Sequence, residues 1–232
     1  MTDMWIKKSA LVVLMLWPAA AAADDFSGEA AVVSDYVSRG VSYSDGHAAI
    51  QGSLTWSNAG GLTGLHADGW VSSIDFGAGD PAKAELWGTV GYSRAVGPLS
   101  FDTGLEYTHY AGAPKALHYA YYDAFVSATA ALGVVSATAA VRHAPDYSGA
   151  AGPATFVDLT AETPVLELLT AEVSLGRANL RPAAGGTYMY WSAGLRAGWK
   201  GLTAAVRYHG SDLGACALPC GHRVVFSVGA GF

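Results

Sequence analysis

Twelve stretches of this sequence alternate apolar and polar residues, and this alternation limits the possible folds more than any other feature. They cover residues 26–39, 47–57, 62–74, 83–94, 98–110, 119–131, 134–144, 154–163, 167–178, 187–199, 201–209 and 222–232. A period of two places successive side chains on opposite faces of a β-strand. Beyond the first 23 residues, no stretch approaches the apolar length of a membrane-spanning helix. The sequence therefore predicts an all-β chain.

The links between these stretches alternate in length. Tight links fall at residues 58–61, 95–97, 132–133, 164–166 and 200–201, and long ones at 40–46, 75–82, 111–118, 145–153, 179–186 and 210–221. Short turns at one rim and long loops at the other are typical of an up-and-down antiparallel transmembrane β-barrel with an even number of strands. We expect residues 24–232 to form one such barrel, with twelve strands and no internal domain boundary.

The composition narrows the alternatives. Only 14% of the residues are charged and 51% are hydrophobic, and after residue 23 the only lysines are Lys83, Lys115 and Lys200. A secreted soluble β-sandwich is the main alternative, but its outer positions should carry more Lys and Glu. The formal net charge of −6 makes nucleic acid an unsuitable partner.

Both ends of the chain indicate export to a membrane. Residues 1–23 combine Lys7 and Lys8, an apolar run and small residues before Asp24, which predicts a signal peptide cleaved after Ala23. The last stretch ends on Phe232. It resembles the closing strand of bacterial outer-membrane barrels, in which the final aromatic residue is part of the signal read by the barrel assembly machinery. We therefore expect the cell outer membrane as the location, with its lipid and that machinery as partners.

The faces of the strands follow from the cost of charge in lipid. An Arg or Lys on the lipid face near the midplane costs about 2–4 kcal/mol, so the charged parity should point inward. The predicted pore-lining residues are Asp35, Arg39, Gln51, Asp68, Glu85, Asp102, Glu106, Asp123, Asp158, Glu172, Arg196, Arg207 and Arg223. Glu29, Glu162 and Arg142 share this inward parity.

This inward set has ten acids against five arginines, which favours a modest preference for cations. Arg39, Arg196, Arg207 and Arg223 fall on strands that become neighbours when the barrel closes, and this arrangement predicts a transverse field across the lumen. The alternative is a plugged, non-conducting lumen in which these groups pair with one another.

Aromatic residues should form a belt at each rim of the outer face. Phe26, Trp56, Tyr92, Phe101, Trp199 and Phe232 fall near the short turns, and Tyr36, Tyr107, Tyr122 and Tyr208 near the long loops.

The remaining reactive residues give weaker signals. His66, His109 and His209 are expected to point inward, but no spacing predicts a metal site or cofactor. Cys216 and Cys220, the only two cysteines, predict a disulfide within the last long loop, with a metal site or free thiols as alternatives.

No catalytic residue is predicted. The chain has neither G-x-S-x-G nor S-x-x-K, and the nearest grouping is His209-Gly210-Ser211-Asp212. We therefore do not expect an enzyme.

Residues 34–52 carry a family resemblance. The pieces Ser34-Asp35-Tyr36-Val37, Arg39-Gly40 and Gln51-Gly52 are similar to the opening of TorF-type porins, small outer-membrane proteins of Gram-negative bacteria; Ala49 replaces a Pro-containing approach common in that family. The resemblance implies an outer-membrane barrel and a porin without a known substrate, and it marks Asp35, Arg39 and Gln51. These three could form a hydrogen-bonded cluster that pins the first hairpin, or they could contact a solute.

The leading expectation is a narrow, weakly cation-preferring channel for passive diffusion of small hydrophilic solutes. A non-conducting structural or adhesion barrel and an outer-membrane lipid hydrolase are the alternatives. The sequence leaves the oligomeric state open.

Overall fold

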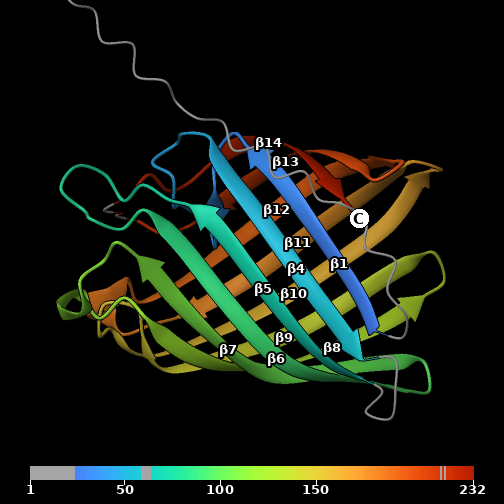
Figure 1. Cartoon of the computed structure of the whole chain (residues 1–232), viewed down its shortest axis with the longest axis horizontal. Coiled ribbons are helices and arrows are strands. Elements are labelled where there is room, and N and C mark those ends of the chain that lie inside the picture. The colour runs from blue at the N-terminus through green and yellow to red at the C-terminus, as the bar shows by residue number, and fades with distance from the viewer. Residues whose placement is uncertain (1–23, 59–63, 215, 217) are drawn as a thin grey trace, which may run out of the picture.

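Twelve antiparallel strands close into a barrel in the described part of the chain (Figure 1). The structure is a computed structural model that describes residues 24–58, 64–214, 216 and 218–232. The barrel strands are β1 Asp24–Val33, β4 Ala49–Asn58, β5 Leu65–Ser73, β6 Ala84–Val96, β7 Leu99–Ala111, β8 Tyr121–Leu132, β9 Val135–Tyr147, β10 Gly152–Leu166, β11 Leu169–Asn179, β12 Thr187–Trp199, β13 Leu202–Ser211 and β14 Arg223–Gly231. Each pairs with its neighbours in sequence order, as an up-and-down barrel requires. The predicted fold class is confirmed.

The barrel closes between its first and last strands. β1 pairs with β14 from Glu29 opposite Gly231 to Val33 opposite Ser227. Beyond that ladder, Phe232 N–H donates to the carbonyl of Gly28 at 3.0 Å. Closure leaves no open sheet edge, so the strands satisfy one another's backbone hydrogen bonds all round the wall.

The short and long links lie on opposite rims, as expected. Turns of two residues join β6 to β7, β8 to β9, β10 to β11 and β12 to β13. The turn between β10 and β11 is Glu167-Leu168, because β10 continues through the expected turn at 164–166. The loop between β9 and β10 spans only residues 148–151, because both strands extend beyond their predicted ends. The loops at 112–120 and 180–186 carry the short helices η1 Lys115–Leu117 and η2 Pro182–Ala184.

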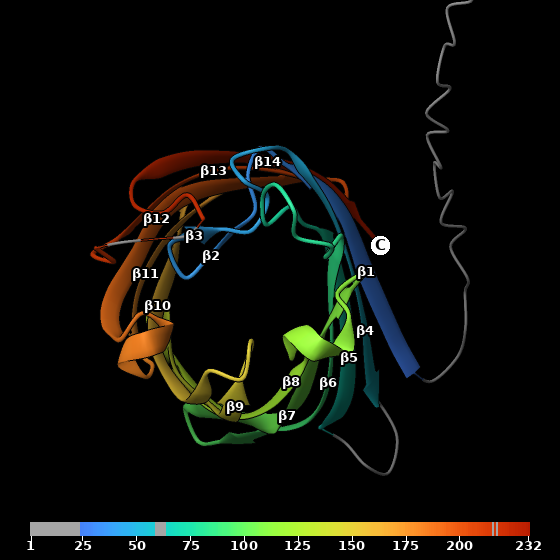
Figure 2. The same cartoon turned by 90° about the vertical axis from the view of Figure 1, so that its left-hand side faces the viewer.

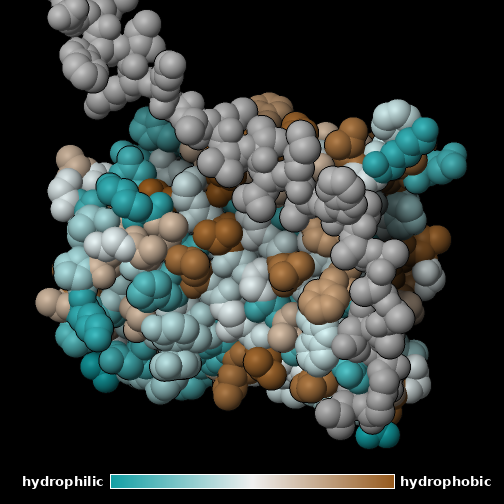
Figure 3. All heavy atoms as spheres, viewed as in Figure 1, coloured by the Kyte–Doolittle hydropathy of each residue, from teal (hydrophilic) through white to brown (hydrophobic). Residues whose placement is uncertain are grey.

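The outer face of the strands is apolar. Val90, Leu105, Tyr122 and Phe226 each expose about three-fifths of their area or more, at 61%, 64%, 65% and 61%. Figure 3 shows such residues across the side of the barrel, while hydrophilic residues gather towards the long-loop end. None of the described helices is long and apolar enough to cross a membrane.

One histidine faces the opposite way from the prediction. His109 has the same parity as the outward Leu105 and Tyr107 and is exposed, with its ring stacked on Tyr107 at 6.4 Å. The inward assignment was wrong because the inward residues of β7 are even-numbered, as Asp102 and Glu106 are.

The first strand is shorter than predicted. β1 ends at Val33, and residues 34–48 fold into the mouth of the barrel, where β2 Val37–Ser38 pairs with β3 Val41–Ser42. Figure 2 looks in from the long-loop end and shows this hairpin inside the ring of strands. Arg39 and Gly40, at φ 48° and 80°, form the turn between β2 and β3. Two consecutive residues of positive φ are the signature of a type I′ hairpin turn, so a continuous strand to Arg39 was wrong.

A cluster of aromatic residues occupies the long-loop half of the barrel. Tyr110, Tyr121, Phe156, Tyr188 and Tyr190 are buried there at the ends of their strands. Tyr36 packs against this cluster, with its ring 5.2 Å from that of Trp70, so its assignment to the outer aromatic belt was wrong. The position of residues 34–48 explains this burial, because the inserted segment fills the space between the rings and the barrel axis.

Candidate functional site

The inserted segment, residues 34–48, contacts the wall of the barrel at three separated places. Asp35 pairs with Arg223 on β14, and the Tyr36 hydroxyl donates to Glu85 on β6 at 2.9 Å. The Arg39 guanidinium lies over the ring of Phe156 on β10, 3.7 Å from its centroid. In the ring of twelve, β14, β6 and β10 are each four strands apart. The segment therefore reaches across the lumen instead of lying along one side.

Asp35 is the polar centre of this segment. The residue is 7% exposed, and its carboxylate accepts hydrogen bonds from Ser42 Oγ at 2.5 Å and Ser44 Oγ at 3.0 Å, in addition to its ion pair with Arg223. A buried carboxylate needs such partners, because burial removes it from water. Asp35 thus joins both ends of the segment to the wall at β14.

Arg39 is held by aromatic rings. Besides Phe156, its guanidinium contacts the Tyr147 hydroxyl at 3.4 Å. No carboxylate within the described residues forms an ion pair with it. Burial, followed by the charges of Tyr147 and Glu85, raises the pKa of Tyr43 in the same segment well above its ordinary value. This tyrosine therefore stays neutral beside the guanidinium.

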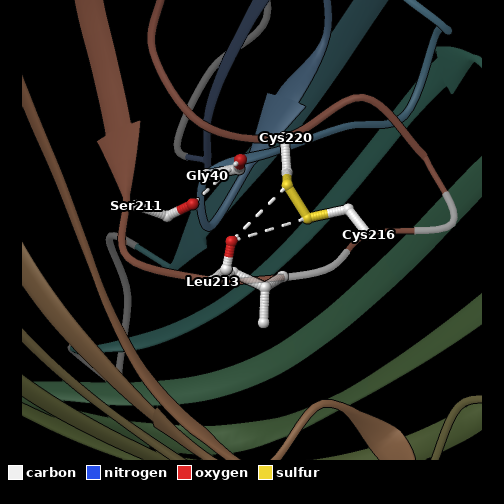
Figure 4. Close-up of a disulfide and its surroundings, with 5 residues drawn as sticks. All are labelled: Gly40, Ser211, Leu213, Cys216 and Cys220. Atoms are coloured by element: carbon white, nitrogen blue, oxygen red, sulfur yellow. Dashed lines mark hydrogen bonds between the residues drawn. A yellow bond between two sulfur atoms is a disulfide. The ribbon is translucent and has the colours of Figure 1, made fainter.

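The last long loop packs against the inserted segment (Figure 4). The Ser42 amide donates to the carbonyl of Pro219 at 2.8 Å, and Val41 forms an isolated bridge with Cys220. The sulfur atoms of Cys216 and Cys220 are bonded to each other and lie 3.9 and 3.8 Å from the carbonyl oxygen of Leu213. The predicted cysteine pair therefore closes the part of the loop that contacts the hairpin.

Gly40 has two reasons to be glycine. Its φ of 80° lies in the left-handed region, and a Cβ there would stand 2.5 Å from Cβ of Ser211. Ser211 Oγ in turn donates to the Gly40 carbonyl at 3.5 Å. The turn of the hairpin is thus fitted directly against the end of β13.

Paired charges line the lumen along its length. His66 lies between Asp68 and Asp102, with one ring nitrogen 2.9 Å from each carboxylate. Arg142 bridges Glu106 at 2.9 Å and Asp123 at 2.5 Å.

Two further ion pairs lie beyond these. Arg207 contacts Glu172 at 2.9 Å, and Arg196 lies 3.7 Å from Glu162. Each of these pairs joins strands two apart in the ring. In these two pairs, the positive charge of each arginine is therefore balanced by a carboxylate on the same wall.

Three lumen carboxylates have only hydroxyl groups as hydrogen-bond donors among the contacts described. Glu29 accepts from Thr203 at 2.8 Å, Glu85 from Tyr36 and Tyr110 at 2.9 and 3.2 Å, and Asp158 from Tyr190 at 2.6 Å. No described Lys, Arg or His lies within ion-pair distance of these three groups.

Polar recesses extend from the middle of the lumen into its short-turn half. One, of about 210 Å³, is lined by Glu29, Gln51, Ser53, Trp70, Arg196 and Arg207. A second, of about 350 Å³, is lined by Thr55, His66, Asp68 and Asp102 among others. This half of the lumen therefore contains space bordered by charged and hydroxyl groups, in contrast to the aromatic half.

Most of the predicted lining residues lie on the inward parity of their strands, where the contacts above place them. Asp35 and Arg39 are exceptions, because they belong to the inserted segment. The structure does not bring the three family-marked residues together: Gln51 Nε2 contacts Ser72 Oγ at 3.4 Å, whereas Asp35 and Arg39 have the partners given above. Arg196, Arg207 and Arg223 occupy the consecutive strands β12, β13 and β14. Arg39 is not on the next strand, β1, because it lies in the turn of the inserted hairpin.

The aromatic contacts of Arg39 were not predicted from the sequence. The run from Tyr36 to Tyr43 reads Tyr-Val-Ser-Arg-Gly-Val-Ser-Tyr, so that the dipeptide Arg-Gly separates two Val-Ser pairs. That is a signal for a two-residue hairpin turn, and it could have located the inward fold. Nothing in the sequence indicates that Tyr147 and Phe156 meet Arg39.

Other chemistry has little support in the geometry. The described residues contain no group of three His, Cys, Asp or Glu side chains placed to hold a metal ion. In the cluster considered for hydrolysis, Ser211 donates to Gly40 and the Asp212 carboxylate accepts from the Met189 amide at 2.7 Å. Both side chains therefore serve the packing of the loop.

The fold is shared by solved porins. The KdgM porin is 10% identical, with a TM-score of 0.60 over 89% of this chain and 98% of that one. The NanC porin is 11% identical, with a TM-score of 0.58 over 90% and 99%. An outer-membrane channel from Pseudomonas putida F1 is 11% identical, with a TM-score of 0.52 over 92% and 97%. A search of curated protein sequences found no match.

The closed barrel with a polar lumen thus defines a porin-like β-barrel protein. Residues 18–230 match the Gcw_chp family, described as bacterial proteins of unknown function. The chain belongs to that family.

Proposed function

We propose that this protein is an outer-membrane channel for passive diffusion of small hydrophilic solutes, narrow and weakly selective for cations. The observation that carries the proposal is a barrel with an apolar outer face, a polar lumen and a segment of its own chain folded inside one end. Such an outer face suits lipid, and a polar interior suits hydrated solutes. By the same reasoning we propose no enzymatic activity.

The narrowness rests on the inserted segment. Residues 34–48 reach β14, β6 and β10 across the lumen, and buried tyrosines fill the space around them. A solute that enters from the long-loop end must pass this constriction before it reaches the polar recesses.

The cation preference rests on the carboxylates that lack basic partners. Glu29 and Asp158 contribute negative charge to the lumen, whereas the unpaired cation Arg39 is engaged with aromatic rings. Rings of acidic side chains favour cations in channels generally.

Ion pairing favours a second candidate, a non-conducting structural barrel. Ordered charge pairs in the lumen are the expected sign of such a barrel, and Arg142, Arg207 and Arg223 all have carboxylate partners. We rank this candidate second because the ion pairs between strands lie along the wall, and recesses bordered by polar and charged residues remain in the lumen.

Planar-bilayer recording of the purified protein tests the proposal. We expect single-channel conductance above leak and, across a KCl gradient, a reversal potential that shows potassium to be favoured over chloride. Glu29→Gln should reduce that preference, since Glu29 lines the lumen, whereas Glu167→Gln in a surface turn should not. Absence of conductance in the wild-type protein would favour the structural barrel.

The location belongs to the same proposal. The predicted signal peptide, residues 1–23, lies outside the described residues, and β1 begins at Asp24, directly after the expected cleavage site. We propose cleavage there, insertion into outer-membrane lipid by the barrel assembly machinery, and membership of the TorF-type porins within this family. Amino-terminal sequencing of protein from the outer-membrane fraction tests the first two points. A chain in that fraction that still begins at Met1 would contradict cleavage, and absence of the protein from that fraction would contradict the location.

A further inference from the structure

Phe156, Tyr147 and Tyr121 form a contiguous aromatic cluster, here called the cage, and the Arg39 guanidinium contacts its Phe156 face and its Tyr147 hydroxyl. Phe156 lies 3.7 Å from the guanidinium, measured from Cζ to the ring centroid, and Tyr147 stacks at an angle between Phe156 and Tyr121, with ring centroids 5.3 and 4.7 Å apart. Phe156 is 1% exposed and Tyr121 is 7% exposed, so the rings are withheld from water. A desolvated aromatic face attracts a planar cation, and guanidinium stacks on such a face better than ammonium does. The cage therefore has the chemistry of a guanidinium-binding site.

The guanidinium reaches the cage from a strained position. Arg39 has a φ of 48°, which residues with a side chain seldom adopt. No described carboxylate lies within ion-pair distance to hold it, so the aromatic contacts and the Tyr147 hydroxyl are its anchors. Strain of this kind persists only where the surroundings hold the residue in place.

The hairpin depends on such anchors. Each of its strands has only two residues, β2 Val37–Ser38 and β3 Val41–Ser42, and an isolated hairpin of that length is not stable alone. Its base is held by Asp35 and by Ser42 against the last loop. Its tip, the turn at Arg39, is held at the far wall, β9 and β10, by the cage, while Gly40 contacts Ser211 on β13, next to the strand that holds the base.

We propose that the cage formed by Tyr121, Tyr147 and Phe156 is a guanidinium-binding site and that its occupation by Arg39 holds the hairpin across the lumen. When the site is empty, the tip of the hairpin leaves the far wall and the channel widens. A free guanidinium ion can fill the same site when the side chain is removed. The consequence for permeation rests on the proposed channel function, but the binding site does not.

Chemical rescue of Arg39→Ala tests both parts. The full mature chain would be purified from membranes as wild type, Arg39→Ala, Phe156→Leu and Arg196→Ala, the last as a control that removes an arginine far from the cage. Hydrogen exchange of residues 34–48 reports the hairpin, and single-channel conductance reports the pore. Each would be measured in millimolar guanidinium chloride and in matched sodium chloride.

We expect amide exchange in residues 34–48 to be about tenfold faster or more in Arg39→Ala, because local opening becomes easier. Guanidinium should slow it towards the wild-type rate. Conductance should rise in Arg39→Ala and fall again with guanidinium. Phe156→Leu should show faster exchange without rescue, and Arg196→Ala should match the wild type in exchange.

Two results would overturn the inference: wild-type exchange rates in Arg39→Ala, or faster exchange that guanidinium slows no more than sodium does. If exchange behaves as expected while neither wild type nor variant conducts, the binding site stands and the channel function fails. If the wild type conducts but exchange does not respond, the channel function stands and the inference fails.

Discussion

At the scale of single residues, the inserted segment depends on positions that tolerate little change. Gly40 combines a left-handed backbone with a close approach to Ser211, and Asp35 combines burial with three partners. Both lie in the stretch that carries the family resemblance. Substitution there should disturb the hairpin more than substitution at comparable positions elsewhere.

Gly40→Ala should destabilise the hairpin by about 1–3 kcal/mol, from backbone strain and from collision with Ser211. Hydrogen exchange at the Tyr43 amide, which donates to the Tyr36 carbonyl, would report the loss. Gly46→Ala is the matched control, because Gly46 has a similar φ of 75° but no atom within 4 Å of the added Cβ. Equal effects of the two substitutions would show that the contact with Ser211 is unimportant.

Asp35→Asn should cost about 3–5 kcal/mol, because it leaves the largely buried Arg223 without its counter-charge. Urea unfolding in lipid vesicles would measure this cost. Glu162→Gln, which breaks the half-exposed pair with Arg196, should cost at most about 1 kcal/mol. A cost for Asp35→Asn no larger than that of the control would contradict a central role for the buried pair.

At the scale of elements, each barrel strand has one apolar and one polar face. Alternation in the sequence located all twelve barrel strands because the period of two is a local property of an extended chain. It failed for residues 34–39, where Asp35 and Arg39 keep the parity of Glu29 but the chain turns inward. Alternation of apolar and polar residues shows which face of a strand each side chain occupies. It does not show at which residue the strand ends.

Val90→Arg tests the orientation of the strands. Val90 is 61% exposed at the middle of β6, so a charge there should cost about 2–4 kcal/mol in a lipid bilayer. Ser53→Arg, which adds the same side chain to the inner face of β4, should cost much less because it lines a polar recess. The urea midpoints of both variants in vesicles give the comparison. A larger loss for Ser53→Arg would reverse the assigned faces.

At the scale of the whole molecule, closure joins the two ends of the chain. Phe232 exchanges backbone hydrogen bonds with Gly28 at 3.0 and 3.2 Å, so the expected assembly signal also lies at the seam of the barrel. Its side chain is 53% exposed, which leaves the ring accessible as well as packed. The two roles can be separated by comparing folding with and without the assembly machinery.

Phe232→Ala should lower the amount of folded protein in the outer membrane severalfold, while refolding into vesicles without the machinery loses only about 1 kcal/mol of stability. Heat-dependent mobility on gels would measure the folded fraction in both settings. Phe226→Ala, an outward aromatic on the same strand, is the control. Equal losses in cells for both variants would remove the case for a terminal signal.

The sequence by itself determined the strands, their faces, the rims that carry turns and loops, and the acidic excess of the lumen. These follow from residue periodicity and from the cost of placing charge in lipid, and both act within a few neighbouring residues. The tertiary structure decided the path of residues 34–48 and the partners of the charged side chains. Arg39 meets Phe156, and Asp35 meets Arg223, only because barrel closure brings distant strands round a common axis.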